Sequence, residues 1–110
     1  ASDVYKRQTN LRTLSAVSAG KSPGDASSIL KIRGTEVEQE LNELLVWAMG
    51  YYAHPYQPGR LFNQQTNMIP VGPDHAVGLM EERLLRRAAS IYGGSNEIQK
   101  NIIAKAIMGL

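Results

Sequence analysis

The sequence has 110 residues, a length that suits one domain, and 43% of them are hydrophobic, enough to furnish a core. The net charge is only +2 at pH 7 and acidic residues are interleaved with basic ones, so we expect no nucleic-acid-binding surface. Without cysteine the chain forms neither a disulfide nor a thiolate metal site, and no apolar run is long enough to span a membrane, so we expect a soluble cytoplasmic protein.

The beginning of the sequence looks foreign to the rest. Residues Asp3–Gln8, with the sequence DVYKRQ, resemble the translated end of an adapter used in transposon-based sequencing libraries. We therefore predict that residues 1–8 are an artefact and that residues 9–110 are the natural domain, with a further part of the protein upstream. The alternative is a natural helix end, because Val4 and Leu11 can be read as helical.

Residues 9–18 are predicted to form the tail of a helix whose beginning is lost. Apolar residues recur at every third position from Leu11 to Val17, and Gly20 then provides a stop signal. A turn rich in helix breakers follows at residues 21–25. The first helix of the domain is therefore expected to be truncated.

The first complete helix is predicted from Ala26 to Met49. Its apolar residues that share a face are expected to be buried: Leu30, Val37, Leu41, Leu44, Leu45 and Ala48. Gly34, in the middle of this helix, costs about 1 kcal/mol relative to alanine and suggests close approach by a neighbouring helix or a ligand. The glutamates scatter around the helix and are interpreted as a solvated face, not as acid–base groups: Glu36, Glu38, Glu40 and Glu43.

Residues Gly50 to Pro73 are predicted to be a long loop. Such a length inside a compact domain usually marks a functional or partner-contacting segment, or disorder. Its tyrosines could stack on bases, but no basic stripe accompanies them, so we expect no nucleic acid there. His54 and His75 each lack a second ligand at useful spacing, so no metal site is predicted.

The second complete helix is predicted from Asp74, as an N-cap, to about Ile91. Its buried stripe is expected to consist of five residues: Val77, Met80, Leu84, Ala88 and Ile91. Acids that lie four or five positions before bases are expected to form surface ion pairs worth about 0.3 kcal/mol each: Glu81 and Glu82 with Arg86 and Arg87.

A glycine turn and a third complete helix end the sequence. Gly93 and Gly94 can adopt the positive φ that closes a helix, Ser95 follows as an N-cap, and Glu97 places a carboxylate in the first turn. The apolar face of this helix is expected to be buried: Ile98, Ile102, Ile103, Ala106, Ile107 and Leu110. The unpaired N–H groups at such a helix start can also receive an anion, whereas the alternative is a turn that only joins two helices.

These elements predict an all-α fold, an up-and-down four-helix bundle with a truncated first helix. The missing beginning of that helix leaves part of the apolar seam open. Such an exposed apolar strip normally marks a partner or an absent domain. We therefore expect the domain to be marginally stable when it is isolated.

Two stretches resemble the acyl-CoA dehydrogenase flavoproteins. Residues 92–99 (YGGSNEIQ), with NIIA at 101–104 and GL at 109–110, resemble the signature that ends the C-terminal domain of this family. Residues 26–31 (ASSILK) resemble the start of a helix in the same domain. Because the two matches occur in the right order, residues 9–110 are identified as an incomplete C-terminal helical domain of this family.

This resemblance implies an enzyme of fatty acid metabolism that binds FAD and oxidises the α,β bond of an acyl-CoA thioester. A carboxylate takes the α-proton and the flavin takes the β-hydride; the subunits form tetramers, and electron-transfer flavoprotein commonly reoxidises the flavin. The residues implied to lie beside the thioester are Tyr92, Gly93 and Gly94. The residues implied to help hold FAD are Ser95, in place of the more usual threonine, with Asn96 and Glu97.

The sequence departs from the family pattern at two places. Many members carry the catalytic glutamate where this chain has Gly93, which cannot abstract a proton, so no catalytic residue is predicted here. The base could lie on an upstream helix, or the chain could be the non-catalytic subunit of a hetero-oligomer. The Gly-Gly-x-Gly-Tyr segment that many relatives use near FAD is also absent, and residues 51–73 stand in its place. A third possibility is a free-standing helical binding module without flavin.

Overall fold

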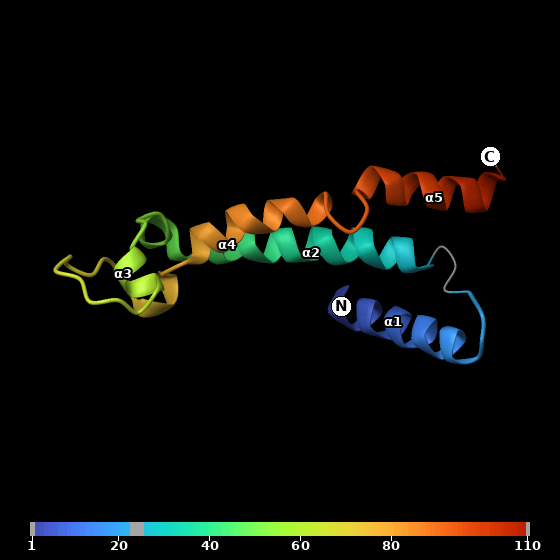
Figure 1. The fold of residues 1–110 in the computed structure, drawn as a ribbon, viewed down its shortest axis with the longest axis horizontal. Helices are drawn as coiled ribbons and strands as arrows, with labels where there is room; N and C mark the ends of the chain where they lie inside the picture. Colours follow the sequence, from blue (N-terminus) through green and yellow to red (C-terminus); the bar gives the residue numbers. More distant parts are fainter. Residues whose placement is uncertain (1, 23–25, 110) are drawn as a thin grey trace. The chain divides into compact units, whose positions relative to one another are not determined.

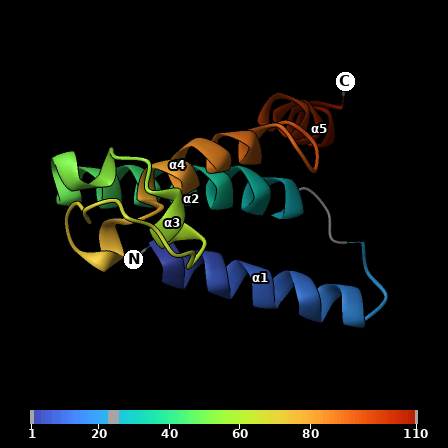
Figure 2. The same ribbon diagram turned by 60° about the vertical axis from the view of Figure 1, so that its left-hand side comes forward.

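The computed structural model describes residues 2–22 and 26–109, and their regular structure is helical (Figure 1, Figure 2). No strand occurs in these two ranges, so the all-α prediction is confirmed. The chain divides into two compact units: the described part of Ala1–Val37 with Ala89–Leu110, and Glu38–Ala88. Helix α2 contributes its first half to one unit and its second half to the other.

In the first unit, α1 (Ser2–Ser18) lies beside the N-terminal half of α2 (Ala26–Met49), and the two helices run in opposite directions (Figure 1, Figure 2). Helix α1 contains the predicted helical segment 9–18, but it begins well before it and crosses the predicted domain boundary without a break. That boundary stays a prediction. The predicted turn follows α1, and its residues 23–25 lie outside the described part of the chain.

Helix α2 has the bounds predicted for the first complete helix. Gly34, near its middle, faces α1: a Cβ built there would lie 3.5 Å from Lys6 Cε and 3.6 Å from Lys6 Nζ. These are ordinary van der Waals distances, so α1 approaches this glycine through a flexible side chain. The approach to Gly34 is thus made by a lysine of the segment that the sequence predicts to be foreign.

The buried residues of α2 differ from the stripe predicted from its apolar residues. They recur at helical spacing and most are polar: Ser28, Ile32, Thr35, Asn42 and Val46. The predicted stripe is wrong at Ala48, which is exposed, and at three leucines, which are 56%, 51% and 42% exposed: Leu41, Leu44 and Leu45. Periodicity identifies an apolar face but not the element that covers it, and the described elements pack on a different face of α2.

Two of the three polar residues buried along α2 form hydrogen bonds within the helix itself. Thr35 Oγ1 donates to Lys31 O at 2.7 Å, and Asn42 Nδ2 donates to Glu38 O at 2.8 Å. Because each group bonds to the carbonyl one turn earlier, its burial leaves no unpaired donor and costs little.

In the second unit, the helix predicted over residues 74–91 is divided. A 3₁₀ turn, η2 (Asp74–Ala76), precedes α4 (Leu79–Arg86), and a second 3₁₀ turn, η3 (Arg87–Ser90), follows α4. Gly78 separates η2 from α4 with a φ of 85°, and a Cβ there would lie 2.8 Å from a methyl group of Leu61. The prediction of one continuous helix is wrong because the backbone becomes left-handed at Gly78, which leaves room for Leu61.

Two details of the same predicted helix are also wrong. The Asp74 side chain does not cap the turn and instead accepts a hydrogen bond from an arginine earlier in the loop. The buried positions of this region are Ala76 and Ala89, whereas Leu84 and Ile91 of the predicted stripe are exposed. The other three positions of that stripe are half-buried. The division at the glycine rotates the two parts and so breaks the single face that was expected.

Helix α4 runs antiparallel to the second half of α2 and is joined to it by arginines (Figure 1). Arg83 donates two hydrogen bonds to Glu43, from Nε at 3.0 Å and from Nη2 at 2.8 Å, and these bonds lower the pKa of Glu43 below its usual range. Arg86 lies 3.0 Å from Glu38 and also pairs with Glu82, which confirms one predicted i,i+4 pair. Glu38 and Glu43 were expected on a solvated face; that is wrong, because both face α4.

The predicted loop 50–73 contains two short helical segments, η1 (Gly50–Ala53) and α3 (Pro58–Leu61). Its base is closed by Gln57, which is buried, donates to Val71 O at 2.9 Å and accepts from Val71 N at 3.0 Å. Arg60 adds hydrogen bonds to Val71 O and Gly72 O and an ion pair with Asp74. The long loop is therefore pinned by side chains, while residues 62–70 are exposed.

Candidate functional site

The turn that precedes the last helix has the local structure that the sequence predicts. Gly93 and Gly94 have φ values of 67° and 86°, and α5 (Asn96–Met108) begins directly after Ser95. Ser95 is the N-cap of α5, and its Oγ accepts a hydrogen bond from Ile98 N at 3.3 Å. Both glycine conformations and the serine cap are confirmed. The two glycines are needed because a side chain is disfavoured at positive φ.

The turn is open to solvent. Tyr92 is 56% exposed, and no described atom beyond the chain neighbours of Gly93 comes within 4 Å of a Cβ built there. At Gly94 a Cβ would lie 2.5 Å from Gln99 Nε2, at the end of a flexible side chain. Another molecule can therefore reach the backbone of the turn directly, as a binding function requires.

Two of the three residues predicted to hold FAD are half-buried and the third is exposed. Asn96 accepts a hydrogen bond from Lys31, with 2.8 Å between Lys31 Nζ and Asn96 Oδ1. Ser95 is occupied by its role as N-cap, and Glu97 extends into solvent from the first turn of α5. The bond between Lys31 and Asn96 joins the two stretches, 26–31 and 92–99, that carry the family resemblance. In the sequence, Lys31 was noted only as the last residue of the stretch 26–31, and its contact with Asn96 was not predicted.

The arrangement can hold an anion but has no proton acceptor at position 93. The first N–H groups of α5 and the ammonium of Lys31 are positive, and they lie beside a backbone without side chains. Position 93 is glycine, so the turn has no carboxylate where many family members have one. Among the described residues, no group of three His, Asp or Glu side chains is placed to bind a metal ion.

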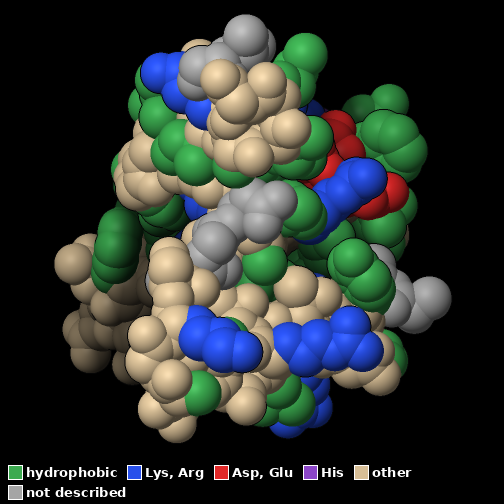
Figure 3. All heavy atoms as spheres, turned by 90° about the vertical axis from the view of Figure 1, so that its right-hand side faces the viewer, with side chains coloured by type: hydrophobic (Ala, Val, Ile, Leu, Met, Phe, Trp, Pro, Cys, Tyr) green, Lys and Arg blue, Asp and Glu red, His purple; other side chains and the backbone are tan. Residues whose placement is uncertain are grey.

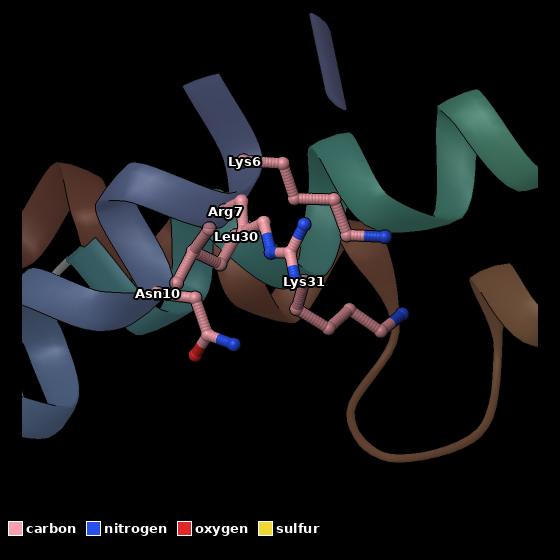
Figure 4. Close-up of a pocket in the computed structure, with 5 residues that line it drawn as sticks. All are labelled: Lys6, Arg7, Asn10, Leu30 and Lys31. Atoms are coloured by element: carbon pink, nitrogen blue, oxygen red, sulfur yellow. The ribbon is translucent and has the colours of Figure 1, made fainter. Parts of the chain in front are cut away.

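Apart from the turn, the first unit has a hollow between α1 and α2 (Figure 4). Its volume is about 530 Å³, and it is lined by both helices: Lys6, Arg7 and Asn10 from α1, and Leu30 and Lys31 from α2. Two of its three cationic side chains, Lys6 and Arg7, belong to the segment predicted to be an adapter translation. We assign no function to this hollow, because the sequence argues against its main charges being native.

Most of the apolar face of α5 is exposed in the part of the chain that the structure describes. Ile98, Ile102 and Ile107 are exposed, contrary to the expected burial, and Leu110 lies outside the described residues. On the face drawn in Figure 3, hydrophobic side chains reach the surface beside Lys and Arg side chains. The prediction that this face is buried is therefore wrong, while the open seam predicted beside the truncated first helix stays a prediction. No helix among the described residues is long and apolar enough to cross a membrane.

Comparison with known proteins gives one family. The family model described as "Acyl-CoA dehydrogenase, C-terminal domain" matches residues 5–108. The acyl-CoA dehydrogenase IpdE1 of Mycobacterium tuberculosis and that of Mycolicibacterium smegmatis are each 67% identical to this chain over 27 residues. The matched stretch is 24% of this chain and only 7% of each relative. No solved structure matches the chain.

Proposed function

Because the chain belongs to the acyl-CoA dehydrogenase C-terminal domain family, we propose that it acts in an FAD-dependent enzyme that oxidises the α,β bond of an acyl-CoA thioester. The matched stretch covers only 7% of each IpdE1 relative, and we propose that the activity belongs to a longer protein to which this chain contributes one domain. The observation that carries the proposal is the open, positively polarised turn at residues 92–97, which coincides with the family signature.

The turn fits FAD in charge and in access. FAD carries a negatively charged diphosphate, and the start of α5 with the nearby Lys31 ammonium offers positive charge on that side of the turn. A Cβ built at Gly93 would meet no described atom within 4 Å, so the backbone is accessible at this residue, while the end of the Gln99 side chain lies against Gly94. We propose that Ser95, Asn96 and Glu97 help to hold FAD, which supplies the hydride acceptor when it is bound.

The preceding residues serve the substrate in this proposal. Tyr92, Gly93 and Gly94 lie beside the thioester end of the acyl-CoA, where their exposed backbone can approach it closely. The residue that removes the α-proton comes from another element of the protein, since glycine at position 93 has no group that accepts a proton. The chain's own contribution is to position the substrate and the flavin.

A second candidate function rests on the same glycine. The chain could belong to the non-catalytic subunit of a hetero-oligomer, in which a partner subunit carries the carboxylate. In either case the exposed apolar face of α5 suits assembly into a homo- or hetero-tetramer. Electron-transfer flavoprotein is the expected acceptor of the electrons.

The test is to purify the full-length protein and record its flavin absorbance before and after acyl-CoA is added without oxygen. Straight-chain, branched and ring-bearing thioesters form the panel. A yellow protein that bleaches with one of them supports the enzyme. A yellow protein that bleaches only after the product of a neighbouring gene is added supports the non-catalytic subunit. A protein that neither retains FAD nor binds added FAD would overturn the proposal.

A further inference from the structure

Lys31 and Asn96 form a hydrogen bond between helices whose contacting residues are 65 positions apart in the chain. Both side chains are half-buried, and both belong to the same compact unit. Neither lies in the segment predicted to be foreign, although Lys31 also lines the hollow to which Lys6 and Arg7 of that segment contribute. Asn96 is the first residue of α5 and one of the residues proposed to hold FAD.

The chemistry of this bond fixes the orientation of the Asn96 side chain. An ammonium group has three donors and no acceptor, so it can bind only the oxygen of a carboxamide. The contact of Lys31 Nζ with Asn96 Oδ1 at 2.8 Å follows that rule. With Oδ1 directed at the lysine, the Nδ2 hydrogens point away from it and are presented as donors. A neutral partner that could also accept would leave the carboxamide free to turn over.

The positive charge of Lys31 is unfavourable next to the start of α5. The N-terminus of a helix is positively polarised, and a cation there opposes the dipole by up to about 1 kcal/mol. The Lys31 ammonium contacts the first residue of α5, whereas Glu97, in the first turn, has the favourable sign. A positive charge at this place becomes favourable when an anion lies beside it. The hydrogen bond to Asn96 offsets this cost within the fold, and an anionic ligand beside Lys31 would remove it.

We propose that Lys31 is a positioning residue that holds Asn96 so that its Nδ2 group donates to an oxygen atom of FAD. This inference rests on the proposed function, because it assumes that FAD lies at the turn. Lys31 acts through Asn96 and does not itself need to touch the flavin. In this way Lys31, from the stretch 26–31, positions Asn96 in the stretch 92–99.

The experiment is a double-mutant cycle for FAD affinity in the full-length protein. Lys31→Met and Asn96→Leu keep the side-chain size and remove the bond, and each is expected to weaken FAD binding about tenfold, the loss of a hydrogen bond to a charged group. If Lys31 acts through Asn96, the double variant is about as weak as Asn96→Leu alone. Lys31→Arg, which is still only a donor, should bind within about twofold of the original protein.

Amide hydrogen exchange of α5 provides a readout that does not need flavin. In the chain without FAD, Lys31→Met should raise the exchange of residues 96–99, and Lys100→Met, a change of another α5 lysine, should not. Equal FAD affinity for the original protein and Lys31→Met would overturn the inference, as would losses that add in the double variant. If the original protein does not bind FAD, the proposed function fails, and the exchange data still decide whether Lys31 orders the turn.

Discussion

Charged and polar side chains have different roles in two regions of the molecule. One region is the interface between α2 and α4, and the other is the turn at residues 92–97. At the interface, Arg83 donates two hydrogen bonds to Glu43, so these two charges are paired with each other within the fold. At the turn, Lys31 brings positive charge to a helix start that is already positive. The first arrangement is satisfied within the fold, whereas the second places a cation at the helix start where we propose that an anionic ligand binds.

Glycines show the same difference between the two regions. Gly72, in the second unit, and Gly93, in the turn, both have positive φ, at 71° and 67°. A Cβ at Gly72 would lie 2.8 Å from Tyr52 Cβ, while the space around Gly93 is open among the described atoms. One glycine is required by packing and conformation, and the other by conformation alone. Substitutions at these positions can therefore separate structural from binding roles.

The largest expected effect is that of Gly72→Ala. Because the backbone is left-handed and the obstacle is the Cβ of Tyr52, not a flexible side-chain end, the free energy of unfolding should fall by about 3 kcal/mol. Urea denaturation followed by circular dichroism measures this change. A loss no larger than that of Gly93→Ala would show that the second unit is not packed tightly at Gly72, and would remove the contrast between the two regions.

Gly93→Ala should lower the stability less than Gly72→Ala does, but it should weaken FAD binding. The substitution should lower the free energy of unfolding by about 1 kcal/mol, the cost of an alanine at positive φ. Gly109→Ala is the matched control, since Gly109 has a φ of 68° and open space around it. The two variants should be equally stable, but only Gly93→Ala should weaken FAD binding in the full-length protein. Equal FAD affinities would place the flavin elsewhere.

Local signals in the sequence predicted the ends of helices well. The bounds of α2 and the Gly93–Gly94–Ser95 start of α5 depend on neighbouring residues alone, and the structure confirms them. The division of the predicted helix 74–91 was missed although Gly78 is visible in the sequence, because the close approach of Leu61, seventeen positions earlier, is a contact between distant segments. Contacts between distant segments leave no mark in local periodicity.

Buried faces were predicted less well for a related reason. An apolar stripe shows which face of a helix prefers to be covered, but the cover for Leu41 and Leu44 on α2 is not supplied by the described chain. The site followed the same pattern. The turn itself was found from its glycines and its family-like sequence, whereas the contact of Lys31 with Asn96 required the structure. The identity of the proton acceptor cannot be predicted from a sequence that has glycine at the expected position.

The third prediction concerns how firmly the turn is held. Ser95→Ala removes the hydroxyl that accepts from Ile98 N, and we expect a loss of about 1 kcal/mol in stability, the usual value for an N-cap. Ser95→Asp keeps an acceptor at the cap and should retain most of that stability. Amide exchange of residues 96–99 reports the change where it occurs. If Ser95→Ala leaves that exchange unaltered, the turn is held by other contacts and the cap contributes little.

The smallest expected effect tests the other side of the comparison, the pair of Arg83 and Glu43. The pair lowers the pKa of Glu43, so it stabilises the fold above the ordinary glutamate pKa of 4.5, and this contribution is lost as the pH falls through the lower folded value. The pKa of Arg83 is raised, so the arginine stays charged throughout that range. Glu43→Gln should therefore be less stable than the original protein at neutral pH and should lose less stability on acidification below pH 4.5.

The stability difference between Glu43→Gln and the original protein should be smaller than that for Ser95→Ala, because both side chains of the pair are about a quarter exposed and solvent screens the pair. Thermal unfolding at several pH values measures it, with Glu40→Gln, an exposed glutamate of the same helix, as the control. Parallel pH profiles for all three proteins would mean that the Arg83–Glu43 pair does not stabilise the fold. The difference between the α2–α4 interface and the turn at residues 92–97 would then depend on Lys31 alone.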